Sequence, residues 1–277
     1  MKIAIIMTVH NRKEKTISCL NILCKNISQS NIYLTNDGCT DGTEEAIKIQ
    51  FPSINIINGD GTLFWNRGMI AAWKEACKNN YDFYIWLNDD TIVTNTFITD
   101  LIKCSEEENH HSIICGATVD PIDHSRITYG GYTKNIKILP ISKEKQYCSF
   151  ASGNIVLIPQ YVVNKIGLLD PAFRHALGDF DYEGRARQYG IKIVQAPNYL
   201  GFCTRHSSIP SWRDKNISLS KRLKKLYSPL GRNPFEMFLF DKRHHSIIIA
   251  FFHFFTLHLR CFFPSLWKLI NRYNEKE

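Results

Sequence analysis

The chain has 277 residues, of which 44% are hydrophobic and 22% are charged. These are the values of a globular protein, and they exclude a disordered or fibrous chain. The formal net charge of +8 arises in residues 213–277, which carry 13 Lys and Arg against 5 Asp and Glu, whereas residues 1–212 carry 21 of each kind. We therefore expect a neutral globular domain over residues 1–212 and a basic tail over residues 213–277.

Apolar runs alternate with helical patterns in the first half of the chain. Residues 2–9 predict a strand, and Ile17, Leu20 and Leu23 then recur at helical spacing. Strands are predicted again at 31–35, 54–57 and 83–87, and helices at 41–50, 65–78 and 96–106. Four successive strand-helix units favour an α/β fold, with a mostly parallel sheet and helices on both faces.

The second half of the domain has fewer helices between its strands. Strands are predicted at 112–119, 127–132 and 152–158, and helices at 160–166 and 179–189. This pattern indicates a mixed extension of the same sheet. The tail, in contrast, combines helical patterns with basic and aromatic residues, so we expect a helical appendage.

The cysteines and the first residues indicate the compartment. The nine cysteines include no Cys-x-x-Cys pair, and Met1 leads directly into a strand with no signal-peptide layout, so we expect a reducing, cytoplasmic setting. His253, His258 and Arg260 interrupt the most apolar stretch of the tail. It therefore falls short of the ~18 apolar residues that a membrane span needs, and we expect the tail to lie on a membrane surface.

Polar residues follow each of the first four predicted strands. They are candidate site residues, because ligands of open α/β sheets bind at the carboxyl ends of the strands. Asp89 and Asp90 follow an apolar strand, and their hard oxygen atoms suit Mn²⁺ or Mg²⁺, with room for water and nucleotide phosphates in the coordination shell. The alternative is that Asp90 caps the next helix. Neither a Gly-x-Gly-x-x-Gly sequence nor a P-loop is present, which weighs against dinucleotide and NTPase sites.

Four polar motifs together resemble those of family two glycosyltransferases with the GT-A fold, in the rhamnosyltransferase-like branch that adds one sugar. The resemblance covers about residues 2–206. The motifs, in chain order, are Thr8-Val9-His10-Asn11-Arg12, Asn36-Asp37-Gly38-Cys39-Thr40-Asp41-Gly42-Thr43, Leu87-Asn88-Asp89-Asp90-Thr91 and Leu177-Gly178-Asp179-Phe180-Asp181-Tyr182-Glu183-Gly184-Arg185-Ala186.

The resemblance implies a role for each matching residue. Asp179 matches the catalytic base at the start of a helix. Asp90 matches the acid that meets a Mn²⁺ or Mg²⁺ ion, and His206 matches a late histidine near that ion. A nucleotide-binding half of about residues 1–111 and an acceptor half of about 112–212 are implied as well. The residues implied in nucleotide and donor binding are Thr8, Asn11, Arg12, Asp37, Gly59, Asp60, Arg67 and Asp89.

The chain also departs from the family pattern. Asn88 replaces the first acid of Asp-x-Asp, and Gly178 stands where a Glu precedes the catalytic Asp. Asp181 lies close enough in sequence to compete with Asp179 for the role of base. The Gln-x-x-Arg-Trp pattern of processive synthases is missing, which favours the addition of a single sugar.

The resulting hypothesis is a metal-dependent, inverting glycosyltransferase of bacterial surface polysaccharide (O-antigen) biosynthesis. It takes a dTDP-linked or UDP-linked sugar, and its acceptor is a saccharide, lipid-linked and presented at the inner face of the plasma membrane. The tail contacts that membrane or forms a homodimer, and its many Phe and aliphatic residues weigh against nucleic acid. A sugar-nucleotide nucleotidyltransferase and a non-enzymatic basic binding module are the two alternatives.

Overall fold

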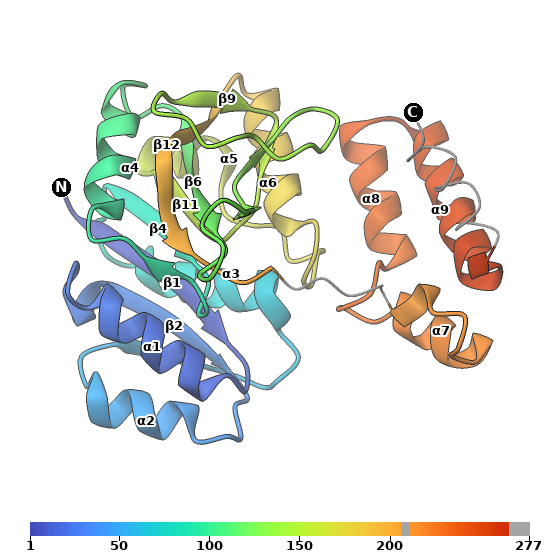
Figure 1. Cartoon of the computed structure of the whole chain (residues 1–277), viewed down its shortest axis with the longest axis horizontal. Helices are drawn as coiled ribbons and strands as arrows, with labels where there is room; N and C mark the ends of the chain where they lie inside the picture. Colours follow the sequence, from blue (N-terminus) through green and yellow to red (C-terminus); the bar gives the residue numbers. More distant parts are fainter. Residues whose placement is uncertain (206–210, 266–277) are drawn as a thin grey trace. The chain divides into compact units, whose positions relative to one another are not determined.

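The computed structural model describes residues 1–205 and 211–265 (Figure 1). Two compact units are distinguished by their internal packing. The first comprises residues 1–174 and 178–205, and the second comprises residues 175–177 together with the chain from 206 onward. The units thus divide ahead of the boundary predicted after residue 212, and Trp212, which is buried, belongs to the second unit.

The first unit is built on a mixed sheet with the strand order β3-β2-β1-β4-β11-β6-β12-β5; β7 pairs with β6, and β9 pairs with β12. The pairs β1–β2, β2–β3 and β1–β4 are parallel, as predicted, whereas β11 runs antiparallel to β4 and β6. A separate two-stranded sheet joins β8 (Gly131–Tyr132) to β10 (Phe150–Ala151). The strands of the main sheet are β1 (Ile3–Val9), β2 (Ile32–Asp37), β3 (Asn55–Gly59), β4 (Phe83–Leu87), β5 (Ile92–Val93), β6 (Ile113–Val119), β7 (Ile127–Tyr129), β9 (Gln146–Cys148), β11 (Ile155–Pro159) and β12 (Ile193–Phe202).

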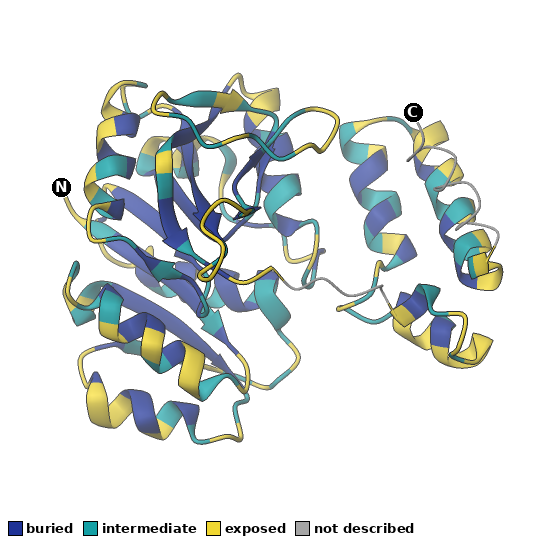
Figure 2. Ribbon diagram, viewed as in Figure 1, coloured by how far each residue is buried: buried dark blue, intermediate teal, exposed yellow. Residues whose placement is uncertain are grey.

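Helices cover both faces of this sheet because its central strands are apolar on both sides. Along β1, Ile5 and Met7 enter the core that includes residues of α1 (Lys13–Leu23), α2 (Thr43–Gln50) and α4 (Phe97–Glu106). Ala4 and Ile6 enter the opposite core, with α3 (Phe64–Ala76), α5 (Gln160–Ile166) and α6 (Gly178–Gln188). Figure 2 shows the result, a buried sheet between helices whose outer faces are exposed.

The predicted elements differ from the observed ones mainly in the second half. The strand predicted at 127–132 is divided into β7 and β8, and the strand predicted at 152–158 begins only at Ile155. The longest strand, β12, was not predicted, because Pro197 and Asn198 interrupt its pattern and Pro is a poor strand residue. Its pairing with β6 shifts register between Gln195 and Tyr199, so the irregularity accommodates Pro197.

The second unit is helical, as expected for the tail. It contains η2 (Ser211–Arg213), α7 (Leu219–Leu226), α8 (Pro234–His244) and α9 (Ile247–Phe262). Asn233 caps α8 by accepting from two backbone N–H groups, and Ser246 caps α9 in the same way through one. Arg222, which is buried, donates to the carbonyls of Cys261 and Phe262 at the end of α9. No helix in residues 1–205 and 211–265 is long and apolar enough to cross a membrane.

Candidate active site

The residues of interest gather where β4 ends and β11 begins. Because the two strands are antiparallel, the start of β11 lies beside the carboxyl end of β4, and Ile155 pairs with Leu87. One step further, the Asn88 N–H donates to the carbonyl of Asn154 at 3.1 Å. The turn that precedes β11 is therefore joined to the Asn88-Asp89-Asp90 motif. The first half of the sheet and its extension meet at this edge.

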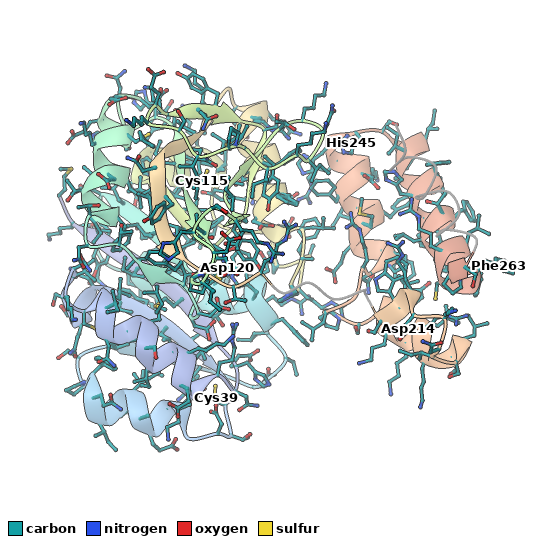
Figure 3. The ribbon with its side chains drawn as sticks, viewed as in Figure 1. Cys39, Cys115, Asp120, Asp214, His245 and Phe263 are labelled. Carbon is teal, nitrogen blue, oxygen red and sulfur yellow. The ribbon has the colours of Figure 1, made fainter. Side chains whose placement is uncertain are left out.

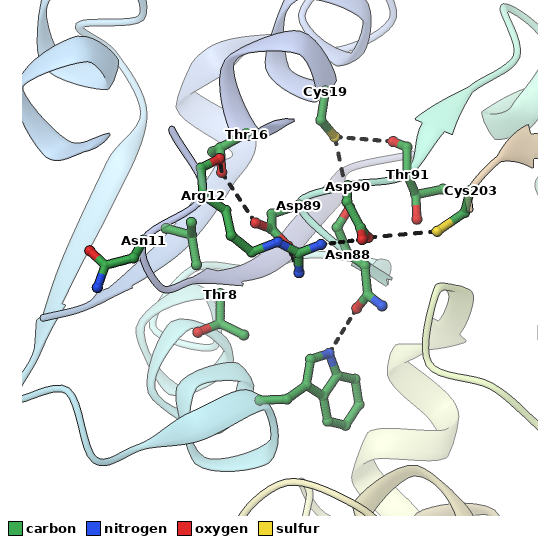
Figure 4. A network of polar contacts seen from close by, with 12 residues as sticks. Thr8, Asn11, Arg12, Thr16, Cys19, Asn88, Asp89, Asp90, Thr91 and Cys203 are labelled. Carbon is green, nitrogen blue, oxygen red and sulfur yellow. Dashed lines mark hydrogen bonds and ion pairs between the residues drawn. The ribbon is translucent and has the colours of Figure 1, made fainter. Parts of the chain in front are cut away.

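Arg12 lies between the two acids of that motif (Figure 4). Its Nη1 is 3.1 Å from Oδ1 of Asp89, and its Nη2 forms an ion pair with Oδ2 of Asp90. Asp89 is buried, and its Oδ2 also accepts from the Thr16 hydroxyl at 3.2 Å. Burial raises the pKa of Asp89 to about 6 even though the Arg12 cation lowers it. Asp89 therefore anchors Arg12, and Asp90 is the acid of the pair nearer the surface.

The carboxylates at this edge suit a divalent ion whose remaining ligands come from a nucleotide. Oδ1 of Asp90 accepts a long contact from the Cys203 thiol at 3.7 Å. Among the described residues no group of three or more His, Cys, Asp or Glu is placed to hold a metal, and His206 lies outside those residues. Mg²⁺ and its relatives commonly take one or two carboxylates and complete their shell with water and phosphate oxygens. Asp90 fits as one such ligand, and the guanidinium beside it shows that these carboxylates attract a cation.

Asp37 organises the loop between β3 and α3. Its Oδ1 accepts from the backbone N–H of Gly61 at 2.9 Å and of Leu63 at 3.3 Å, and its Oδ2 accepts from Phe64 N–H at 2.9 Å. The register of β2 and β3 places Asp37 beside Gly59, where an added Cβ would lie 2.7 Å from Oδ1 of Asp37. The carboxylate thus shapes the predicted donor loop directly, and Gly59 provides the space for it.

The other predicted donor residues lie around this loop and mostly bond to the backbone. Asn11 accepts from Thr40 N–H at 2.7 Å and has a positive φ of 51°. The Thr8 side chain is covered by α3, where a Cβ at Gly68 would lie 2.2 Å from its hydroxyl. Asp60 accepts from the N–H and hydroxyl of Thr62, and Arg67 donates to the Pro171 carbonyl at 2.9 Å. Arg67 therefore contacts the segment that leads into α6.

Asn88, which replaces the first acid of Asp-x-Asp, has a hydrogen-bond partner that accounts for the replacement. Its Oδ1 accepts from the indole Nε1 of Trp65 at 2.8 Å. The ring of Trp65 in turn packs against Gly153, where an added Cβ would lie 2.5 Å from the indole. Asn88 therefore fixes Trp65, a residue of α3 whose ring also contacts Trp86 edge to face.

Asp179 is the first acidic residue of α6 and is half-buried. Its Oδ2 accepts from Gly153 N–H at 3.2 Å, and its Oδ1 accepts from Phe180 N–H at 2.9 Å. Burial raises the pKa of Asp179, and these two N–H bonds offset part of the rise. A helix N-terminus favours the ionised form of an acid. Burial works in the opposite direction and makes Asp179 a better proton acceptor.

Asp181, the alternative base, is in a different environment. It is fully buried, and its Oδ2 accepts from Arg185 Nε at 3.0 Å, one helical turn later. Arg185 also donates to the carbonyls of Ile166 and Leu168, so the pair ties α6 to the end of α5. The Asp181 carboxylate is therefore bonded inside the protein, whereas Asp179 is half-buried; the choice between the two acids as base stays a prediction.

Gly178, the second departure from the family pattern, is explained by a lack of space. A Cβ at this position would lie 1.9 Å from Oδ1 of Asn66. Asn66 is fully buried and donates through Nδ2 to the carbonyls of Asp170 and Phe173. The sequence does not indicate that Asn66 holds the segment before α6, because a single Asn inside a helical pattern gives no signal of this contact.

We predict that Gly178→Ala lowers the free energy of unfolding by about 1–3 kcal/mol, the usual cost of overpacking. Denaturant unfolding of the purified variant measures this directly. The double variant Gly178→Ala with Asn66→Ala removes the clash, so its loss should be smaller than the sum of the two single losses. Additive losses would show that the two residues do not compete for the same space.

Comparison with known proteins assigns the chain to a family. The sequence model described as glycosyl transferase family 2 matches residues 4–167, and the chain belongs to that family. A search of curated proteins gave no match.

Solved structures resemble the fold at low sequence identity. A structure of GalNAc-T7 with UDP, GalNAc and Mn²⁺ aligns at a TM-score of 0.57 and 12% identity, over 90% of this chain and 56% of that one. The chain thus spans little more than half the length of GalNAc-T7. A mannosyltransferase, PcManGT from Pyrobaculum calidifontis with GDP-Man and Mn²⁺, aligns at 0.56 and 10% identity over 92% and 73% of the two chains. TarS of S. aureus with UDP-GlcNAc aligns at 0.53 and 12% identity over 91% and 73%. The fold is that of the GT-A glycosyltransferases.

Proposed function

We propose that the protein transfers one sugar from a nucleotide diphosphate sugar to a hydroxyl of a saccharide acceptor, with inversion at the anomeric carbon. The observation that supports this proposal is that a chain of contacts connects Asp90 and Asp179 at one edge of the sheet. Asp90 follows Asn88 at the end of β4, Asn88 bonds to Trp65, and Trp65 packs on Gly153, whose N–H bonds to Asp179. A cation-binding acid and a half-buried base are thus held by one continuous set of contacts.

Asp179 acts as the general base in this proposal. As the acceptor oxygen forms its bond to the anomeric carbon, its proton moves to the Asp179 carboxylate, and the bond from that carbon to the diphosphate oxygen breaks. The electron pair of the broken bond leaves with the nucleotide diphosphate. One carboxylate suffices for a single displacement of this kind, and a raised pKa favours proton uptake.

Asp90 and Arg12 serve the leaving group. A divalent ion, Mn²⁺ or Mg²⁺, supplies positive charge to the departing diphosphate when it is bound. Asp90 would hold that ion from the protein side, and Asp89 keeps Arg12 beside it. Since the Arg12 side chain is 34% exposed, its guanidinium can contact phosphate oxygens while it remains near Asp89.

The nucleotide and the sugar are assigned by analogy. The similar structures were determined with UDP, GDP-Man and UDP-GlcNAc, and the rhamnosyltransferase-like motifs favour a dTDP-linked or UDP-linked hexose or rhamnose here. Thermal stabilisation of the protein by UDP, dTDP, GDP and CMP, each with and without Mn²⁺, tests the proposal. We expect one diphosphate to stabilise the protein only with Mn²⁺, by about 2.7 kcal/mol at 100 times its Kd. If none of the three diphosphates does so, the proposed donor site is wrong.

We further propose that α9 rests on an anionic membrane surface and that the acceptor is lipid-linked, as in bacterial surface polysaccharide assembly on the inner face of the plasma membrane. The large apolar residues on one side of α9 are exposed, and the residues opposite, Ala250, Leu257 and Cys261, are buried. Figure 3 shows Phe263 projecting just beyond the end of this helix. The exposed face consists of Ile248 (77%), Phe252 (62%), Phe255 (61%), Leu259 (53%) and Phe263 (55%).

Charge favours a lipid surface over a second copy of the chain. Residues 213–277 carry a formal charge of +8, so two such tails repel each other, whereas anionic lipids complement them. Exposed lysines of α7, a helix held to the end of α9 by Arg222, add to this charge. An apolar face flanked by basic residues is typical of helices that lie in the membrane interface.

Flotation with vesicles tests the membrane proposal. We expect the protein to float with vesicles that contain phosphatidylglycerol and to remain in solution with phosphatidylcholine alone. The double variant Phe252→Ser with Phe255→Ser should reduce flotation about tenfold or more, because it removes two exposed rings from the face. The matched control is Ile49→Ser, an exposed residue of α2 in the first unit, which should float normally. A dimer in light scattering without flotation would assign the face to self-association.

A further inference from the structure

Glu183 is a buried acid that the proposed reaction does not use. It lies one helical turn after Asp179 on α6 and is fully buried. Its Oε2 accepts from the backbone N–H of Ala151 at 2.7 Å. Its Oε1 has no hydrogen-bond partner among the residues that the structure describes. Burial of a polar side chain lowers stability unless hydrogen bonds compensate for the lost hydration, so the burial of Glu183 needs an explanation.

The spacing of two acids on α6 matches the spacing of two amides on a neighbouring segment. Four residues of helix rise by about 6 Å. Two residues of extended chain span about 6.6 Å. Asp179 and Glu183 are four residues apart, and the N–H groups that they accept belong to Gly153 and Ala151, two residues apart. The segment 151–153 therefore lies along α6 and is held at both ends by a carboxyl group.

The same segment is fixed from its other sides. The N–H of Ser152 donates to the carbonyl of Gly130 at 3.0 Å, and the Trp65 ring packs against Gly153. Asn154, the next residue, accepts from Asn88 N–H at the end of β4. The position of segment 151–153 therefore sets where the Asp179 carboxylate lies relative to the Asn88-Asp89-Asp90 edge.

We propose that Glu183 is a positioning residue for the base: by accepting from Ala151 N–H it holds segment 151–153 against α6, so that Gly153 N–H orients the Asp179 carboxylate. This inference rests on the proposed function, in which Asp179 takes the acceptor proton. Misplacement of a reacting group by about 1 Å can cost on the order of 100-fold in rate, so an indirect contact of this kind has a measurable effect.

The protonation state of Glu183 guides the choice of variants. Burial raises the pKa of Glu183 well above its ordinary value, and the nearby Asp179 raises it further. A protonated carboxyl group resembles a carboxamide in shape and retains the carbonyl oxygen that accepts from Ala151. Glu183→Gln should therefore preserve the contact, whereas Glu183→Met fills the same volume and offers no comparable acceptor.

Steady-state kinetics of these two variants test the proposal. We expect Glu183→Gln to keep kcat within about threefold of the native protein. Glu183→Met should lower kcat at least tenfold while the Kd for the donor nucleotide, measured by calorimetry, changes less than about twofold. The matched control is Val162→Ala, which shortens a fully buried apolar side chain of α5 and leaves the hydrogen bonds of Ala151 and Gly153 to α6 in place, so it should lower stability and keep its kcat.

Two outcomes would overturn the inference: a Glu183→Met enzyme as fast as the Val162→Ala control, or a Glu183→Gln enzyme as slow as Glu183→Met. Should Glu183→Met fail to fold, Gly153→Ala displaces the same segment from the Trp65 side, and unchanged kcat in that variant would also refute it. Asp179→Asn separates this inference from the proposed function. Normal turnover there removes the base assignment itself, whereas an inactive Asp179→Asn with a fast Glu183→Met removes only the role of Glu183.

Discussion

Asp179→Asn is expected to lower kcat by about 10²- to 10⁴-fold, the usual contribution of a positioned general base. The amide keeps an oxygen that can accept from Phe180 or Gly153, so the fold of the α6 N-terminus should survive. It cannot take up a proton at neutral pH. The donor nucleotide contacts other residues in the proposed site, and its Kd should therefore change less than about twofold. Transfer assays together with calorimetry separate the two effects.

Asp181→Asn is the matched comparison, because it makes the same change two residues away. Asp181 is fully buried and paired with Arg185, and removing one charge of a buried pair typically costs about 3–5 kcal/mol. We expect this variant to unfold at lower temperature and to retain turnover below that temperature. Near-normal turnover in Asp179→Asn combined with loss of turnover in Asp181→Asn would reverse the assignment of the base.

Asp90→Asn is expected to abolish the metal-dependent part of stabilisation by the nucleotide diphosphate. In the proposed site Asp90 is the carboxylate that meets the ion, and a neutral amide is a much poorer ligand for Mn²⁺ or Mg²⁺. The shift of about 2.7 kcal/mol expected at 100 times Kd should therefore shrink to the value measured without metal. Thermal unfolding with and without Mn²⁺ provides this comparison.

Asp100→Asn is a suitable control, since it neutralises an acid in the first turn of α4 that accepts from the Thr96 hydroxyl of the same turn. It should leave the metal-dependent shift intact. A full shift in Asp90→Asn would mean that the ion is held elsewhere, for instance through His206, which lies outside the described residues. A shift lost in both variants would instead point to general weakening of the protein.

The fold of the first half could be predicted from local patterns because each strand-helix unit is continuous in sequence. In β1, Ala4 and Ile6 face one core while Ile5 and Met7 face the other, and such two-sided apolar strands are recognisable from sequence alone. In the second half, β8 and β10 are two residues long, and β12 contains Pro197. Pairing between distant segments stabilises these strands, so their own sequences carry little signal.

Only part of the candidate site could be predicted from the sequence, again because some of its contacts join residues that are distant in sequence. Asp90 and Asp179 belong to motifs that a sequence displays directly. The roles of Asn66 and Asn88 depend on which side chain lies opposite, namely Gly178 and Trp65, and these partners are far away in sequence. Glu183 carried one usable signal, its four-residue spacing from Asp179 on a predicted helix. Its amide partner, Ala151, could not be anticipated without the tertiary structure.

The position of Arg12 has a consequence for the order in which ligands bind. With its guanidinium between Asp89 and Asp90, the proposed donor edge carries one net negative charge in place of two before any ligand arrives. A free divalent ion must compete with an attached cation for the same carboxylates and gains little by binding alone. A nucleotide diphosphate changes the balance, because its phosphates attract both Arg12 and the ion. We therefore expect the metal to enter together with the donor and to leave with the spent nucleotide.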